Sequence, residues 1–343
     1  MNGRERILAA AGLAAVDRPP VLPVLLMQGA RELGISLGQY FSNPSRLAEG
    51  QIRLLERYDH DGAFAFPHIV QDVLPWGADI SFHEGGPPSL SKMAFKSIED
   101  LVAAPVPDPT RHAYLRNTLQ AAETLKRQVG NEKLVVGAVI GPFSLATMLV
   151  GTGKYLSLMF DDADRFRRLW PSLVRSMVEY SSRWARAQFD AGCDLVVFAE
   201  GIASATILDE RTFLREARPV LEEFVRRTKG ILALEFVGEA RPFLKHVKDL
   251  GVAAFLVGSG DPLIECRRAL GPQKALMGNI NNIKLQRWEP ERIQFEARRA
   301  IAKGGKGFIL SNQGPEVPWD VPDEAISALV SAATGARAAA AAA

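Results

Sequence analysis

Four ionisable side chains stand at, or just beyond, the ends of strand-like apolar runs: His68, Glu200, Glu235 and Glu316. A carboxylate beside a buried apolar strand needs a partner, a metal ion or water. Carboxylates together with an imidazole suit a divalent metal such as zinc, for which His68 and Glu235 are the candidate ligands. The same groups equally suit general acid–base catalysis. The alternative is structural, with each acid paired to an arginine such as Arg31.

The elements that would position these side chains are eight apolar runs separated by longer amphipathic stretches. The runs cover residues 21–27, 62–66, 134–140, 195–199, 231–236, 253–257, 275–277 and 307–310. Helices are expected between them, for example over 44–58, 211–227 and 289–303. Regular alternation of strands and helices requires parallel pairing with right-handed crossovers. We therefore predict an α/β protein with a (β/α)8 TIM barrel, in which catalytic groups gather at the carboxyl ends of the strands.

Two stretches interrupt the regular alternation of strands and helices, and we interpret them as insertions after the second and third strands. Residues 71–91 are rich in Gly and Pro and could form a hairpin over the barrel mouth, and residues 143–188 hold two or three helices where one would suffice. Neither stretch has the composition of a linker, so residues 1–337 are expected to form one domain. The alanine run at 338–343 is set aside as a frayed, disordered or artefactual tail.

Composition excludes several other classes of protein. Forty-one Lys and Arg residues against 39 Asp and Glu give a formal charge of +2, with no basic run interleaved with aromatic residues, so nucleic-acid binding has no support. Apolar stretches are too short to cross a membrane, and two cysteines cannot build a disulfide framework. We expect a compact cytoplasmic protein. The sequence leaves its oligomeric state open, a homodimer included.

The loop 258–261 (GSGD) is the remaining local motif that could have a binding function. A glycine-rich turn before a helix can hold a phosphate group through backbone N–H groups. Short glycine turns are also common after barrel strands, which makes a purely structural turn the stronger interpretation.

Several stretches, in order over most of the chain, resemble the uroporphyrinogen decarboxylase superfamily, which also contains corrinoid-dependent methyltransferases. They are residues 4–10 (RERILAA), 17–21 (DRPPV), 141–145 (GPFSL), 278–280 (GNI) with 290–291 (PE), and 307–311 (GFILS) with Pro318 and Pro322 beyond. The resemblance implies a (β/α)8 barrel, in agreement with the number of apolar runs.

Departures from the family patterns narrow the implied activity. Of the arginine-rich run that binds substrate carboxylates in the decarboxylases, only Arg31 is kept, and their catalytic aspartate, tyrosine and late histidine align with His68, Met148 and Gln313. The zinc-binding His-x-Cys and Cys of the coenzyme M-type methyltransferases correspond to Glu235, Val237 and Gln313. The resemblance therefore implies neither porphyrinogen decarboxylation nor thiol methylation on a thiolate-bound zinc.

The stretch 313–318 (QGPEVP) resembles the O-demethylase-like branch, whose substrates are methyl ethers. This implies a corrinoid-dependent methyltransferase that moves a methyl group from a small O-methylated donor, such as an aryl methyl ether, to a cobamide. A metal, zinc for example, or a proton donor would activate the ether oxygen. The cobamide would be free or held by a corrinoid carrier protein, because this sequence lacks the Asp-x-His-x-x-Gly signature of cobalamin carriers.

The same hypothesis assigns roles to individual residues. His68, Glu200, Glu235 and Glu316 would bind the metal or transfer protons. The substrate would be oriented by Gln28, Arg31, Asn279 and Gln313 and walled by Phe143. Two alternatives stay open: a corrinoid-free decarboxylase or lyase of a small carboxylated substrate, and a catalytically inactive binding barrel.

Overall fold

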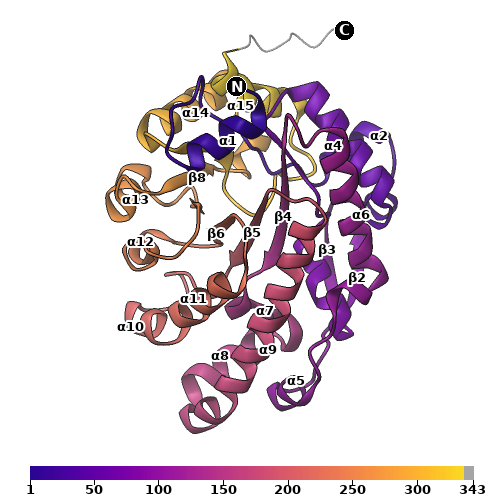
Figure 1. Ribbon diagram of the computed structural model, residues 1–343, viewed down its shortest axis with the longest axis vertical. Coiled ribbons are helices and arrows are strands. Elements are labelled where there is room, and N and C mark those ends of the chain that lie inside the picture. Colours follow the sequence, from indigo (N-terminus) through magenta and orange to yellow (C-terminus); the bar gives the residue numbers. More distant parts are fainter. Residues whose placement is uncertain (336–343) are drawn as a thin grey trace.

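The computed structural model describes residues 1–335 and is built around a curled sheet of seven parallel strands (Figure 1). Neighbouring strands follow one another in chain order, so each connection carries helices back across the outside of the sheet. The strands are β1 (Gly62–Phe64), β4 (Leu134–Ile140), β5 (Leu195–Glu200), β6 (Leu232–Phe236), β7 (Ala254–Leu256), β8 (Ala275–Ile280) and β9 (Phe308–Asn312). The predicted α/β class is confirmed.

The first predicted strand, over 21–27, is not a strand in the structure. Val21 makes a single parallel bridge with Leu310 of β9, and the Asp61 N–H donates to the Val21 carbonyl on the other side. Pro19, Pro20 and Pro23 interrupt this segment, and proline cannot donate the N–H that a strand ladder needs. The segment thus lies between β9 and β1 with one bridge in place of a ladder.

Helices surround the sheet on its outer side (Figure 1). The α-helices are α1 (Gly3–Ala11), α2 (Gln28–Leu33), α3 (Leu37–Ser42), α4 (Pro44–Tyr58), α5 (Ile98–Ala103), α6 (Ala113–Gln128), α7 (Pro142–Val150), α8 (Thr152–Asp161), α9 (Ala163–Asp190), α10 (Glu210–Thr212), α11 (Arg218–Arg227), α12 (Arg241–Val247), α13 (Leu263–Leu270), α14 (Pro290–Gly304) and α15 (Asp323–Thr334). Shorter turns of helix are η1 (Ile69–Trp76), η2 (Pro109–Arg111), η3 (Phe213–Ala217) and η4 (Lys284–Gln286).

The helix predictions rest on caps that the structure contains. The Asn43 side chain accepts from the N–H groups of Ser45 and Arg46 and so starts α4. Asp209 accepts from the Thr212 N–H at 2.6 Å, at the start of the stretch predicted over 211–227. In the structure that stretch is α10, a π-helical turn and α11 in succession.

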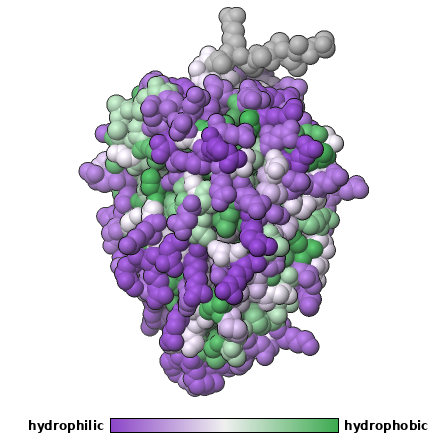
Figure 2. Space-filling model, turned by 45° about the vertical axis from the view of Figure 1, so that its right-hand side comes forward, coloured by the Kyte–Doolittle hydropathy of each residue, from purple (hydrophilic) through white to green (hydrophobic). Residues whose placement is uncertain are grey.

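The region 71–91 contains an antiparallel hairpin of β2 (Asp79–His83) and β3 (Gly86–Lys92), and the region 143–188 contains α7, α8 and most of α9. The alanine tail at 338–343 lies outside the described residues. No single helix in residues 1–335 is long and apolar enough to span a membrane; α7 and α8, bent by 116° at their junction, meet the length and composition criteria only as a pair. The face shown in Figure 2 is mostly hydrophilic, with small hydrophobic groups between the hydrophilic residues.

Strand residues alternate between two hydrophobic cores. The outer core lies between sheet and helices and includes Val135, Val139 and Phe198. The inner core fills the concave side and includes Phe64, Val136 and Met277. Helix α1 closes the amino-terminal end of this inner space, where Ile7 and Ala10 join the inner core.

Candidate functional site

The inner core is not filled: it encloses a cavity of about 250 Å³. The wall is apolar, formed by inward-facing strand residues, except for two carboxyl groups, those of Glu235 and Glu316. The interior of a barrel of this kind is normally packed with bulky branched side chains. Here alanine occupies inward positions on four strands, Ala138, Ala199, Ala233 and Ala254, and the missing side-chain volume leaves the space.

Glu235 lies on β6 at the wall of the cavity and is 7% exposed. Its Oε1 atom has no hydrogen-bond partner among residues 1–335. Burial, and next the negative charge of Glu316, raise the pKa of Glu235 to about 8. Removing a carboxyl group from water disfavours its charged form, and a second carboxylate nearby adds to that cost. Near neutral pH Glu235 is therefore mainly a protonated acid that is able to donate a hydrogen bond.

Glu316 belongs to the loop after β9 and is half-buried. Burial raises its pKa to about 7. The loop is fixed by polar contacts: the Asn282 amide donates to the Glu316 carbonyl at 2.6 Å and accepts from the Gln313 amide at 2.9 Å. Glu235 and Glu316 thus form a carboxyl pair, which we call the Glu235–Glu316 pair, in a largely water-poor site.

Gly314 brings this loop into contact with the pair. A Cβ atom built on Gly314 would lie 1.3 Å from Glu235 Oε1, which no side chain could tolerate without displacement. The backbone of the loop therefore lies directly against the acid, and only glycine permits that approach.

The structure does not bring Glu200 to the cavity. Ala199 lines the cavity, so the next residue of β5 faces the helices. Glu200 is fully buried and accepts from the Phe143 N–H at 3.1 Å and from Ser144 Oγ at 2.5 Å, at the amino terminus of α7. Burial raises its pKa to about 7 in spite of these hydrogen bonds. The contacts give Glu200 a capping role for α7.

His68 also lies outside the residues that line the cavity. It precedes η1 and is 3% exposed, with ring contacts to Phe41, Phe82 and Tyr114. Its Nε2 shares a hydrogen bond of 2.8 Å with the Tyr114 hydroxyl, and its Nδ1 has no partner. Burial lowers the pKa of His68 to about 3, so the imidazole is neutral. Two residues earlier, Phe66 does line the cavity.

The residues present do not fit the zinc site suggested by the sequence. Within residues 1–335, no three His, Cys, Asp or Glu side chains form a group that could hold a metal ion. The cavity wall offers two carboxyl groups and neither imidazole nor thiol, whereas catalytic zinc sites use three protein ligands rich in histidine or cysteine.

Gln28 and Arg31 hold a segment of the chain instead of lining the cavity. The Gln28 amide donates to the carbonyls of Val317 and Pro318, both at 3.0 Å. Arg31 donates to the Trp319 and Val321 carbonyls and pairs with Asp323. Together they fasten the segment that follows Glu316 to helix α2, which makes them positioning residues for that side of the site.

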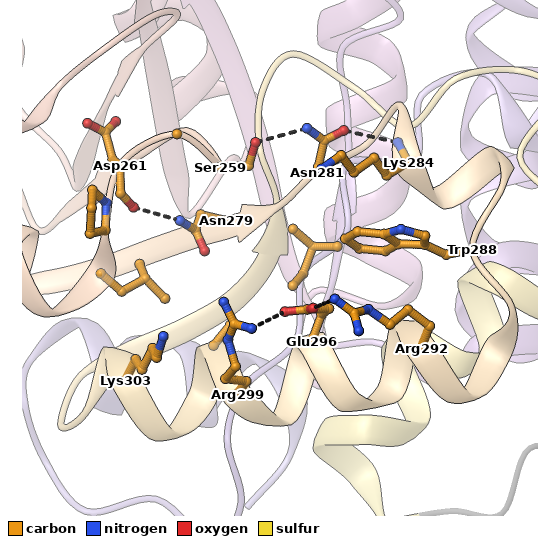
Figure 3. Close-up of a pocket in the computed structure, with 15 residues that line it drawn as sticks. Ser259, Asp261, Asn279, Asn281, Lys284, Trp288, Arg292, Glu296, Arg299 and Lys303 are labelled. Atoms are coloured by element: carbon orange, nitrogen blue, oxygen red, sulfur yellow. Dashed lines mark hydrogen bonds and ion pairs between the residues drawn. The ribbon is translucent and has the colours of Figure 1, made fainter.

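The other residues assigned to substrate binding lie in two further places. Phe143 is 1% exposed and packs edge-on against Tyr155 and Trp170 in the outer core. Gln313 accepts from the Ser259 N–H at 2.9 Å, which ties the loop after β9 to the loop after β7. Asn279 donates to the carbonyls of Gly258 and Asp261 and lines a second cavity, outside the sheet (Figure 3).

The cavity itself was not predicted from the sequence. The sequence does contain a sign of the cavity: β4, β5, β6 and β7 each carry one inward-facing alanine. Such positions normally carry the bulky side chains of a filled interior, so several small residues at one level predict empty space.

Comparison with known proteins assigns the chain to a family. The family model for uroporphyrinogen decarboxylase (URO-D) matches residues 2–335. This chain belongs to the URO-D family, and its relatives include enzymes of two kinds. A uroporphyrinogen decarboxylase of Pseudomonas fluorescens is 27% identical over 325 residues, 88% of either chain. A methylcobamide:CoM methyltransferase of Methanosarcina barkeri is 24% identical over 340 residues, 96% of either chain.

A solved structure shows the same fold. A methyltransferase from Methanosarcina mazei superimposes with a TM-score of 0.87 and 23% sequence identity, covering 97% of this chain and 98% of its own. The resemblance inferred from the sequence is thereby confirmed at the level of family and fold. Decarboxylases and methyltransferases are similarly close in sequence, so the choice between the two activities depends on the site.

Proposed function

We propose that this chain is a methyltransferase that moves a methyl group from a small O-methylated donor to a cobamide supplied by a partner protein or free in solution. The observation that carries the proposal is the Glu235–Glu316 pair in an apolar cavity. We further propose that the segment around Val21, with one bridge and no strand ladder, takes the place of the eighth strand and closes a (β/α)8-type barrel, with the pair at the carboxyl end of its strands.

The cavity wall favours a neutral donor. Among the residues that the structure describes, no Lys, Arg or His lines it. A substrate carboxylate would therefore be buried there without a counter-charge, which costs on the order of several kcal/mol. A methyl ether has one weak acceptor oxygen and otherwise apolar surface. Such a molecule matches a wall that presents hydrocarbon and a single protonated acid. The lack of a counter-charge also disfavours the carboxylated substrate of a decarboxylase or lyase.

The protein's own part in the reaction is proton delivery. Protonated Glu235, whose Oε1 has no partner, would donate a hydrogen bond to the ether oxygen of the bound donor. As the bond between oxygen and methyl carbon breaks, the proton moves to the oxygen, which leaves as an alcohol or phenol and not as an anion. Burial, and next the negative charge of Glu316, keep the pKa of Glu235 high enough for the acid to be protonated at neutral pH. The cobamide supplies the nucleophile that accepts the methyl group.

The zinc route is not part of this proposal, because the donor set around Glu235 does not fit a zinc ion. A general acid contributes a rate factor of roughly 10² to 10⁴. Loss of Glu235 is thus expected to reduce turnover by about that factor.

The test is methylation of cob(I)alamin by methyl ethers, followed by the absorption spectrum of methylcobalamin. Methoxybenzene and 4-methoxybenzoate form a matched pair that differs by one carboxylate. We expect the neutral ether to react faster and Glu235→Gln to slow the reaction by at least about 100-fold. Glu239→Gln should leave the rate unchanged, because Glu239 is exposed and paired with Arg241. Glu235→Gln with full activity would overturn the assignment.

Two other results would select the alternative functions. Consumption of a carboxylated substrate without any cobamide would indicate the corrinoid-free decarboxylase or lyase. Binding of neutral aromatic compounds, with no turnover under any condition, would indicate an inactive binding barrel.

A further inference from the structure

A second cavity, of about 450 Å³, lies on the outside of the sheet and shares no lining residue with the interior one. Its walls are the loop after β7, the end of β8, η4 and helix α14 (Figure 3). Nothing in the proposed methyl transfer uses it. It is large enough for a small organic ligand, since ligand pockets occupy roughly 300 to 1,000 Å³.

Four cationic side chains line this cavity: Lys284, Arg292, Arg299 and Lys303. Arg292, Glu296, Arg299 and Lys303 are spaced by four, three and four residues, which places them along one face of α14. Figure 3 shows this row facing Asn279, Asn281 and Ser259 across the cavity. The spacing therefore builds a continuous charged wall.

The carboxylates at the cavity do not balance these charges. Glu296 is the one acid of the row and is shared by Arg292, at 2.5 Å, and Arg299, at 3.3 Å. The Asp261 carboxylate accepts from the N–H groups of Ala240 and Arg241, on the side of α12. Asp261 is thus already satisfied elsewhere.

Two of the cations are free to meet a ligand. Lys303 has no hydrogen bond or ion pair to any residue in 1–335. The Lys284 ammonium lies 5.7 Å from the centre of the Trp288 ring and forms no ion pair with a carboxylate in the described part of the chain. Several cations gathered around one concave surface create a positive potential that attracts an anion.

We propose that this cavity binds a phosphate group, either free or carried by a small molecule. A phosphate monoester has up to two negative charges and several acceptor oxygens, which match Lys284, Arg299 and Lys303 in charge and in donors. The Ser259 hydroxyl and the Asn281 amide, which bond each other at 3.0 Å, add polar groups to the same wall. Half-buried Trp288 offers an apolar surface to an organic part of the ligand.

The experiment measures binding of inorganic phosphate and of AMP by titration calorimetry at constant ionic strength, with adenosine as the uncharged control. The variant Lys284→Ala/Arg299→Ala/Lys303→Ala removes the three cations. Arg298→Ala is the matched control, because Arg298 is exposed on the same helix but does not line the cavity. A Trp288→Phe variant supplies a fluorescence readout at the cavity.

We expect saturable binding of phosphate or AMP that weakens by at least about tenfold in the triple variant and not in Arg298→Ala. A fluorescence change on binding should disappear in Trp288→Phe. Tighter binding of AMP than of phosphate would identify an esterified ligand, and equal binding would identify free phosphate. The proposal is overturned if neither compound binds, or if the triple variant, with an unchanged melting temperature, binds as well as the wild type.

Discussion

Gly314 and Glu235 stand in direct contact: a methyl group in place of one glycine hydrogen would lie 1.3 Å from the Oε1 atom of the acid. The loop after β9 therefore fixes where the carboxyl group can lie, and the carboxyl group fixes how closely the loop can approach. This relationship makes the proposed acid sensitive to a single backbone position.

Gly314→Ala should displace the Glu235 carboxyl or lift the loop, because no space exists for the added carbon. We expect a loss of about 1 to 3 kcal/mol in stability from overpacking, and a loss of most methyl-transfer activity. Gly201→Ala is the control, since nothing lies within 4 Å of a Cβ atom there. Urea titrations and initial rates provide the two readouts, and a fully active Gly314→Ala enzyme would contradict the contact.

The pH dependence of the methyl-transfer rate should show that the carboxyl groups of Glu235 and Glu316 are coupled. Methyl transfer requires protonated Glu235, so the rate should fall as the pH rises through about 8. Glu316→Gln removes the negative neighbour that raises the pKa of Glu235, so the fall should move to lower pH. Initial rates of both proteins across the alkaline range test this, and an unchanged or higher midpoint in Glu316→Gln would show that the two carboxyls are not coupled.

Stability should respond to pH in the direction set by a raised pKa. The pKa of Glu235 rises from 4.5 to about 8 on folding. Its stabilising contribution is complete below 4.5 and is lost as the pH rises through about 8, because the unfolded chain ionises first. Relative to wild type, Glu235→Gln should gain more than about 1 kcal/mol across that window. Melting curves with Glu239→Gln as reference measure the gain, and a constant difference would rule out the raised pKa.

Glu200 and Glu235 should behave oppositely when truncated. Glu200→Ala removes the acceptor for Phe143 N–H and Ser144 Oγ and should cost about 2 to 3 kcal/mol of stability. Glu235→Ala should reduce turnover by at least about 100-fold without lowering the melting temperature, because Oε1 has no hydrogen-bond partner within residues 1–335 to lose. Thermal unfolding and activity of both variants decide this, and an inactive, fully stable Glu200→Ala would return Glu200 to the catalytic group.

Chelation should leave the activity intact. The carboxyl pair lacks the histidine and cysteine donors of a catalytic zinc site, so treatment with EDTA should change the rate by less than about twofold. Elemental analysis of the same samples gives the zinc content per chain. Stoichiometric zinc whose removal abolishes the reaction would overturn this assignment of the site.

The sequence allowed the order of the seven strands from β1 to β9 and the helix starts to be predicted, because alternation and capping are local properties. It also selected Glu235 and Glu316, two residues that line the cavity. It did not separate Glu200 from them, since the strand expected to end at 199 includes Glu200 and turns that side chain toward α7. The place of the His68 side chain, outside the cavity, was not predicted for a different reason. Its direction depends on Phe41 and Tyr114, which are distant in sequence and meet it only in the folded chain.

The single bridge at Val21 makes the junction between this segment and β9 a weak point of the sheet, where local unfolding should begin. Elsewhere in the sheet each strand is held by a ladder of several residue pairs. Here three backbone hydrogen bonds hold the junction: the Leu22, Leu310 and Asp61 amides donate to the Leu310, Pro20 and Val21 carbonyls, respectively. Amide protons at this junction should therefore exchange with solvent through a local opening that leaves the central strands protected. The first and last parts of the chain would then separate before the rest unfolds.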